Sequence, residues 1–205
     1  MSKTKNKKIK KEEIASQRRE QILKSAVKVF SKCGFAEADV EEIARLANLG
    51  KGTVYRYFET KENLFFATVQ WTMEKVKNET SQAMIRIDDP FQQLKDSLQA
   101  YLCFFEKHRE FYRVLFEERK TLLGKVKRRM IDKYFSFSRI FEKPITEGIK
   151  TGIFVKVKPQ ETAFALLGLT DALVHKWLVS EKKYSLKGQL PLIITTFFNG
   201  LLKKK

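Results

Sequence analysis

Apolar residues recur every three to four positions along most of this 205-residue chain, which is the period of an α-helix. The first clear apolar stripe runs through Ile22, Ala26, Val29, Phe30 and Cys33. Gly34 follows it and is suited to the left-handed position that ends many helices. Alternation with a period of two, the pattern of a half-buried strand, is nearly absent. The chain is therefore expected to be all-α.

Two shorter apolar stripes follow, and only the three residues 48–50 (Asn-Leu-Gly) separate them. The first stripe consists of Val40, Ile43, Ala44 and Ala47. Asp39, three residues before Glu42, has the form of a capping box at its start. The second stripe is Val54 and Phe58, with Gly50 as the expected cap. Two short helices joined by a three-residue turn make a helix-turn-helix, which places its second helix in the major groove of DNA.

Helical periodicity continues to the C-terminus. A long connecting helix is predicted from Thr60, its N-cap, to about Ile87, before Asp-Asp-Pro at 88–90. Residues 153–157 are the only strand-like stretch and are predicted to form a loop. Further helices are predicted at about 91–107, 109–119 and 122–150, from Pro159 onward, and from residues 189–191 onward, which gives about nine in all.

The chain reads Gly-Phe at 34–35, Ile-Ala at 43–44, ANLGKGTVYRYF at 47–58 and KENL at 61–64. This order closely resembles the DNA-binding domain of tetracycline-repressor (TetR) family regulators and covers about a quarter of the chain. The resemblance implies an N-terminal three-helix bundle containing the helix-turn-helix and a C-terminal helical domain for ligand binding and dimerisation. The predicted division is a disordered basic arm at residues 1–11, a DNA-binding domain at 12–60 and the helical domain at 61–205.

The start of the predicted recognition helix is suited to binding anions, because its first turn offers free backbone N–H groups. By resemblance, Lys51 and Thr53 approach bases or phosphates, Tyr55 and Tyr57 bond the phosphate backbone, and Lys61 binds a further phosphate. The alternative for the two tyrosines is simple packing between helices. The candidate DNA-binding residues are Lys51, Gly52, Thr53, Tyr55, Arg56, Tyr57 and Lys61.

The net charge of +17 lies mostly outside this DNA-binding region. Residues 12–65 hold nine Lys and Arg against nine Asp and Glu, whereas residues 1–11 hold six lysines. Asp39, Glu41 and Glu42 place carboxylates near the face expected to meet DNA, where they oppose phosphate binding. The lysine-rich arm either adds DNA affinity without sequence information or serves as a solubilising tail.

Seventeen phenylalanines are many for this length, and most lie in the second domain. Each could be ordinary core; as a set they suit an apolar pocket with a few polar groups. Asp171 and His175 share a helix face, which fits a buried pair or a polar anchor for a ligand. The candidate ligand-binding residues are Phe104, His108, Phe111, Tyr134, Phe164, Asp171 and His175.

The family resemblance implies a ligand-responsive regulator, a repressor, that binds a palindromic operator as a dimer formed by its last two helices. The effector is expected to be hydrophobic or amphipathic. Glu147-Gly148, Asp171 and Trp177 have a spacing that resembles fatty-acid-responsive members and implies a fatty-acyl effector; aromatic or cationic drugs are the alternative. A second hypothesis is a helical architectural protein that binds nucleic acid without ligand control.

Other classes of function find no support in the chain. No Gly-rich phosphate loop or nucleophile motif is present, so an enzyme is not expected. Two histidines and two cysteines are too few for an expected metal site, and no cofactor is predicted. No apolar run approaches the roughly 18 residues that span a bilayer. A cytoplasmic protein without a membrane partner is therefore expected.

Overall fold

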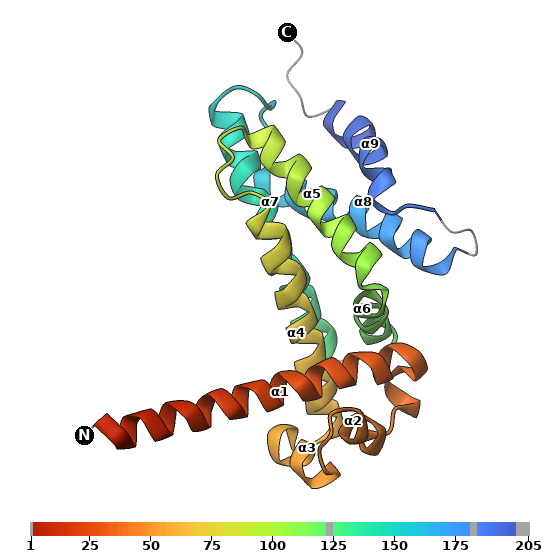
Figure 1. The fold of residues 1–205 in the computed structure, drawn as a ribbon. Coiled ribbons are helices and arrows are strands. Elements are labelled where there is room, and N and C mark those ends of the chain that lie inside the picture. The colour runs from red at the N-terminus through yellow and green to blue at the C-terminus, as the bar shows by residue number, and fades with distance from the viewer. Residues whose placement is uncertain (1, 122–124, 181–183, 200–205) are drawn as a thin grey trace. The chain divides into compact units, whose positions relative to one another are not determined.

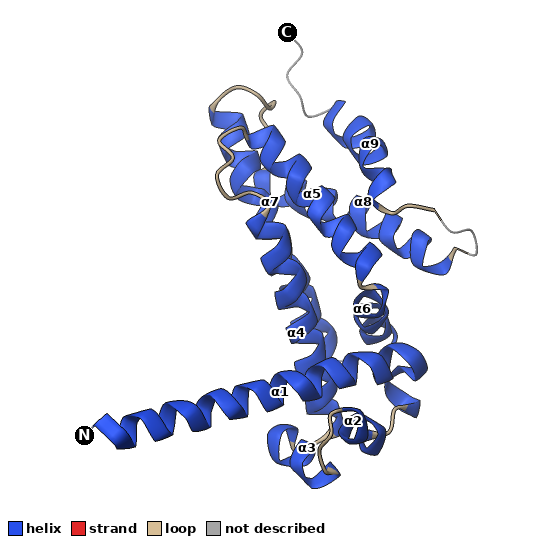
Figure 2. Ribbon diagram, viewed as in Figure 1, coloured by secondary structure: helices blue, strands red, loops and turns tan. Residues whose placement is uncertain are grey.

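The computed structural model describes the backbone of residues 2–121, 125–180 and 184–199, and it is helical almost throughout (Figures 1 and 2). Nine α-helices and no strand lie within these ranges, which confirms the all-α prediction. The chain divides into two compact units. The first contains Met1–Thr72 and Arg113–Thr121; the second contains Met73–Tyr112 and Leu122–Lys205. By this division the predicted domain boundary after residue 60 lies inside the first unit, at the start of a helix.

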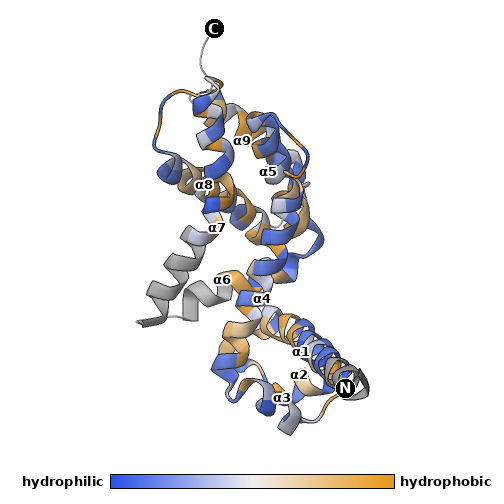
Figure 3. Cartoon of the chain, turned by 90° about the vertical axis from the view of Figure 1, so that its left-hand side faces the viewer, coloured by the Kyte–Doolittle hydropathy of each residue, from blue (hydrophilic) through white to orange (hydrophobic). Residues whose placement is uncertain are grey.

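Helix α1 spans Ser2–Glu37 and is much longer than its apolar stripe predicts. Residues 2–11, expected to be disordered, are its first turns and extend beyond α2 and α3 in Figure 1. Lysine is a good helix former and no Gly or Pro interrupts the segment, so helix can continue from the packed part of α1. Apolar (orange) and polar (blue) residues are both present along the packed part, as Figure 3 shows.

Gly34 distorts α1 near its end, with φ 77° and ψ 179° inside a helix that is assigned as far as Glu37. Only glycine adopts this φ/ψ combination readily, so the predicted role of Gly34 as a break is confirmed although helical residues follow it. Cys33, expected on the apolar stripe, is exposed. The apolar core of the first unit instead contains Ile22, Leu23, Ala26, Phe30, Ile43, Val54, Phe58 and Phe65.

Helices α2 (Val40–Leu46) and α3 (Lys51–Phe58) form the predicted helix-turn-helix. The Asp39 carboxylate caps α2 by accepting the Glu41 N–H at 2.8 Å, one position earlier than the capping box predicts. Asn48 occupies the left-handed region with φ 51°, a conformation that asparagine tolerates better than most residues. The turn is therefore set by local chemistry, and it fixes the direction in which α3 leaves α2.

Helix α4 spans Lys61–Gln82, and the Thr60 hydroxyl caps it by accepting the Asn63 N–H at 3.0 Å. The predicted N-cap is confirmed, but the helix ends about one turn before the predicted Ile87. Turns follow Gln82, and Arg86 has φ 69°, which is incompatible with a continuing α-helix. Residues Lys61–Thr72 of α4 belong to the first unit and Met73–Gln82 to the second.

The second unit is built on α5 (Pro90–Lys107), α7 (Lys125–Lys150) and α8 (Pro159–Val179), which pack against one another. Helix α6 (Arg109–Thr121) begins in this unit and ends in the first. Residues 153–157 form a loop, as predicted. A 3₁₀ turn (Lys187–Gln189), the short α9 (Leu190–Ile193) and a π-helical turn (Ile194–Phe198) follow. The part of the predicted last helix past residue 199 lies outside the described residues.

Helix α8 is long and apolar enough to cross a membrane by length and composition alone. The expectation that no apolar stretch approaches this length was therefore wrong. A core helix of a soluble protein meets the same criteria, and 44% of the most apolar window of α8 is buried. Its inward residues Ala163, Leu166, Leu167 and Val174 are fully buried, so α8 acts as a core helix within the second unit.

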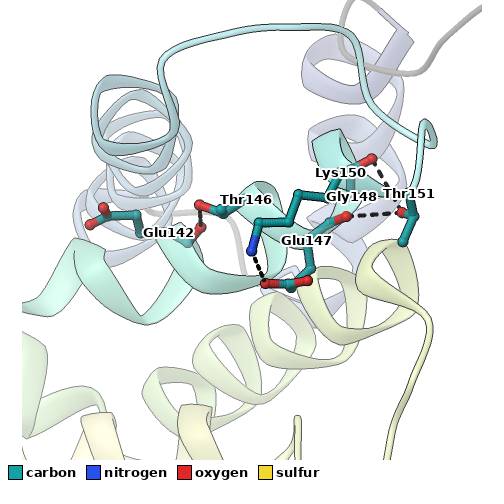
Figure 4. Close-up of polar contacts among 6 residues, drawn as sticks. All are labelled: Glu142, Thr146, Glu147, Gly148, Lys150 and Thr151. Atoms are coloured by element: carbon teal, nitrogen blue, oxygen red, sulfur yellow. Dashed lines mark hydrogen bonds and ion pairs between the residues drawn. The ribbon is translucent and has the colours of Figure 1, made fainter.

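The last turn of α7 is closed by side-chain hydrogen bonds to backbone carbonyls (Figure 4). The Thr151 hydroxyl donates to the carbonyl of Glu147 at 2.9 Å, and the Lys150 ammonium lies 3.0 Å from the Glu147 carboxylate. The Phe154 N–H donates to the Gly148 carbonyl at 2.9 Å and brings the buried Phe154 ring over the helix end. The chain thus turns sharply between α7 and α8.

Gly148 is required by this close approach. A Cβ at this position would overlap the ring of Phe154, which is too enclosed to move freely. Gly148→Ala is therefore expected to lower the free energy of unfolding by about 1–3 kcal/mol, the usual cost of overpacking. Thermal melting measures this cost. Gly52→Ala in α3 is the control for thermal melting, because a Cβ there meets nothing within 4 Å and alanine favours a helix, so stability should be equal or higher. Equal melting of both variants would contradict the packing argument.

Candidate DNA-binding surface and effector-binding residues

The N-terminus of α3 is open and carries unused hydrogen-bond donors. Gly50 caps it without a side-chain bond, and the Thr53 N–H donates to the Gly50 carbonyl at 2.8 Å. A Cβ added at Gly50 or Gly52 would meet nothing within 4 Å. Neither glycine is therefore needed for internal packing, and both leave the backbone accessible to a large anion.

The side chains of α3 divide into an inward and an outward set. Val54 and Phe58 are buried, as predicted. Lys51, Tyr55 and Arg56 are exposed, with Tyr55 at 37% of its surface. Thr53 and Tyr57 are half-buried. The exposed Tyr55 is available to a phosphate, whereas partial burial of Tyr57 fits both DNA contact and packing between helices.

Lys51 is paired with an acid on the preceding helix. Its ammonium lies 3.5 Å from the carboxylate of Glu41, and both side chains are largely exposed, at 47% and 73%. Glu41 is in the first turn of α2 and Lys51 in the first turn of α3, so the pair joins the two N-termini of the motif. Sequence spacing alone did not predict this contact between residues ten positions apart.

Lys61 is engaged within the first unit rather than free. Its ammonium donates to the Ala36 carbonyl at 2.8 Å and lies 5.1 Å from the centre of the Phe35 ring. A cation in this position satisfies a carbonyl at the end of α1 and ties that end to the start of α4. A phosphate contact by Lys61 would have to be shared with this role or replace it.

Three of the predicted ligand-binding residues lie together where α5 meets α6. Phe104 is buried, and its ring centre lies 5.0 Å from that of His108 and 5.4 Å from that of Phe111. His108 caps the C-terminus of α5 through its backbone N–H, and its ring lies 3.8 Å from the Glu110 carboxylate. These three residues form an aromatic cluster, here called the α5–α6 cluster, with a polar edge at His108.

Asp171 is buried and hydrogen-bonded to two tyrosines that the sequence did not identify as its partners. The Tyr112 hydroxyl lies 3.0 Å from its carboxylate, and the Tyr101 hydroxyl lies 3.4 Å away. The carboxylate therefore connects α8 to α5 and to the first turn of α6. His175, one turn further along α8, is half-buried. This network accounts for the burial of a charged side chain in an apolar helix.

The remaining two ligand-binding candidates lie elsewhere. Phe164 has 36% of its surface exposed, on the outward side of α8, and it does not line the interior of the unit. The side chain of Tyr134 lies outside the described residues. The seven candidates are therefore not brought together into one site: three form the α5–α6 cluster and Asp171 belongs to the tyrosine network.

Arg109 is a half-buried polar residue that sequence reasoning missed. Its guanidinium stacks on the ring of Trp177 at 4.7 Å and donates to the carbonyl of Leu178 in the last turn of α8. The positive charge at a helix C-terminus is favourable, so Arg109 fastens the start of α6 to the end of α8. Trp177 is fixed in turn by its indole N–H, which donates to the Tyr184 carbonyl at 3.0 Å.

No metal-binding arrangement is found where the structure describes the chain: no group of three His, Cys, Asp or Glu side chains could hold an ion there. The best-defined site is thus the exposed face of α3. An open helix N-terminus, a cation and an exposed tyrosine on a helix-turn-helix define a DNA-binding protein of the major-groove-reading class.

Comparison with known proteins identifies the family. A family model described as bacterial regulatory proteins of the tetR family matches residues 22–68, and a model of the tetracyclin repressor-like C-terminal domain matches residues 88–181. An uncharacterized HTH-type transcriptional regulator from Bacillus subtilis is 30% identical over 161 residues, covering 78% of this chain and 84% of its own. The chain belongs to the TetR family of transcriptional regulators.

Relatives and solved structures extend the likeness over the full fold. The fatty acid metabolism regulator protein of Bacillus subtilis is 22% identical over 197 residues, 90% of this chain and 95% of its own. The FadR structure from that organism, in complex with stearoyl-CoA, superposes with a TM-score of 0.80 at 21% identity, over 88% of this chain and 97% of its own. A regulator from Saccharomonospora viridis in complex with choline has a TM-score of 0.79 at 18% identity, over 92% and 100%.

Proposed function

We propose that this protein is a ligand-responsive transcriptional repressor that binds a palindromic operator as a homodimer and releases it when a small amphipathic molecule binds its second unit. The observation that supports the proposal most directly is the exposed α3 face, where Lys51 and Tyr55 flank an open helix N-terminus. Its place of action would be the cytoplasm, where its operator lies.

DNA contact is assigned to the face of α3 and the start of α4. Lys51 reads a base edge, because a lysine can donate to the guanine acceptors in the major groove. Tyr55 and the backbone of Gly52 contact phosphates, and Thr53, Arg56, Tyr57 and Lys61 complete the predicted interface. Phosphate contacts position the protein on the duplex, and base contacts select the sequence.

The homodimer is assigned to the outward face of α8 and the last helical segment. Small residues at Ala165, Gly168 and Ala172 lie on this face together with the exposed Phe164 and Val179. Exposed apolar side chains beside small ones allow a second helix to approach closely and bury the patch. This assignment gives Phe164 a role at the subunit contact rather than in the effector pocket.

The effector is assigned to the α5–α6 cluster, where Phe104 and Phe111 supply apolar contact and His108 a polar edge. An amphipathic molecule such as a fatty-acyl compound fits this combination. Two solved relatives of the same fold carry stearoyl-CoA and choline, so the two probes to compare are a long acyl thioester and a quaternary amine.

Selection of binding sites from a random duplex library tests the proposal. The full chain is expected to enrich an inverted repeat whose half-sites lie about 34–36 Å apart, with two chains bound to each site. Affinity for the enriched site should exceed that for random DNA by at least about 10³-fold at physiological salt. An architectural protein would instead give no enriched sequence and mainly salt-dependent binding, which would overturn the repressor proposal.

A further inference from the structure

Two cations of the predicted DNA-binding face have partners within the first unit. Lys51 is paired with Glu41, and the Lys61 ammonium is bonded to the Ala36 carbonyl. Residues 12–65 are electrically neutral in a chain of charge +17. Attraction to any phosphate backbone, the source of non-specific DNA binding, is therefore weak at the surface that reads sequence.

We infer that Glu41 is a specificity-determining residue, which holds Lys51 away from the phosphates of non-operator DNA. The inference rests on the proposed function and adds to it a role for an acid that makes no favourable contact with DNA. On random DNA, Lys51 has no matching base edge, so it can add to the binding affinity only by contacting a phosphate. Glu41 competes with that phosphate for the same ammonium at 3.5 Å.

Operator DNA changes this competition. There the Lys51 ammonium hydrogen-bonds to a base edge, and these bonds stabilise the complex whether or not Glu41 is present. Glu41 therefore lowers the affinity for random DNA more than the affinity for the operator. The ratio of operator affinity to random-DNA affinity rises as a result. A residue that excludes wrong partners is as useful for discrimination as one that binds the right one.

A stabilising role explains the pair less well. Ion pairs between largely exposed side chains contribute little to folding, because water screens them and two long side chains must be ordered. Glu41 also lies in the first turn of α2, where an acid favours the helix. Glu42 lies in the same turn and provides the same benefit, so it is the matched control.

The test compares Glu41→Gln with Glu42→Gln in the full chain. Affinity is measured for the selected operator and for a random duplex. The salt concentration is varied from about 0.05 to about 0.3 M, a range that includes physiological ionic strength. For Glu41→Gln, affinity for the random duplex is expected to rise about five- to tenfold at the lower salt. Its log–log salt slope should steepen by about 0.9, the effect of one additional phosphate contact. Operator affinity should rise less than threefold, and the melting temperature should change by less than about 2 °C.

A second background decides whether Glu41 acts through Lys51. In Lys51→Gln protein, Glu41→Gln is expected to leave the random-duplex affinity and its salt slope nearly unchanged. An equal increase in both backgrounds, or an equal increase from Glu42→Gln, would overturn the inference, because the acid would then act only through its general negative charge. Failure of wild type to prefer any sequence would instead refute the proposed function, so the two failures are distinguishable.

Discussion

Replacing Lys51 by Ala is expected to weaken operator binding by about 1–3 kcal/mol, five- to 150-fold, and to relax base preference at one position of each half-site. The side chain is exposed and its only described partner is the carboxylate of Glu41, so the fold should not change. Competitive binding to single-base variants of the operator measures both effects. The largest loss of discrimination should occur at one symmetric pair of positions.

Tyr55→Phe provides the contrasting result. It removes one exposed hydroxyl and keeps the ring, and it should weaken all operator variants by a similar factor because a phosphate contact carries no sequence information. Lys32→Ala, an exposed charge on α1, controls for the general loss of positive charge. If Lys51→Ala and Tyr55→Phe both bind like wild type, α3 is not the recognition helix.

Lys61→Ala, a third variant of the predicted interface, is expected to affect stability as well as DNA binding. Its ammonium holds the Ala36 carbonyl and lies over Phe35, so truncation removes a link between α1 and α4 as well as a cation. Any loss of DNA affinity must therefore be compared with the melting temperature of the first unit. The sequence could suggest the phosphate contact but not this second role, because the two partners are 25 residues apart.

The helix-turn-helix was predictable because its determinants are local. Gly34 and Asn48 adopt the left-handed conformations their residue types favour, and the apolar spacing of Val54 and Phe58 fixes the inward side of α3. The end of α4 was not predictable by the same means. The helical pattern continues past Gln82, and only the backbone turn at Arg86 shows where the helix has ended.

The contacts made by the effector-binding candidates could not be predicted, because their partners are distant in sequence. The network at Asp171 joins residues 59 and 70 positions apart, and no periodicity relates Tyr112 or Tyr101 to α8. Phe164 was a candidate as one of the phenylalanines of the second domain, but helix geometry places it on the outward side of α8. Composition can indicate an apolar domain, whereas choosing its ligand-contacting residues requires the packing of the helices.

Helix α4 is not the only helix whose residues are divided between the two units. Helix α6 also belongs to both units: Arg109 to Tyr112 lie in the second and Arg113–Thr121 in the first. Its first turn is fastened to α8 through Arg109 on Trp177 and Tyr112 on Asp171. We propose that an effector shifts α4 in a pendulum-like motion and that α6 moves with the second unit.

Stearoyl-CoA, as the probe effector, is expected to lower operator affinity by about 5- to 150-fold, a coupling of about 1–3 kcal/mol. A dimer must place two recognition helices in major grooves about 34–36 Å apart, so a small shift of each DNA-binding unit is enough to lose the operator. Phe104→Trp should abolish this response by filling the α5–α6 cluster while leaving operator binding intact. Choline at equal concentration tests whether a cationic amine is the better effector.

Thermodynamic linkage provides the strictest check of this mechanism, because coupling between two binding sites is reciprocal. If stearoyl-CoA weakens operator binding by a given factor, saturating operator must weaken stearoyl-CoA binding by the same factor. Calorimetric titration of the probe into free protein and into the protein–operator complex measures this directly. Random duplex of equal length, at a concentration that does not bind, is the control. Equal probe affinity in free and operator-bound protein would show that this ligand does not distinguish the two conformations, and release by it would then be ruled out.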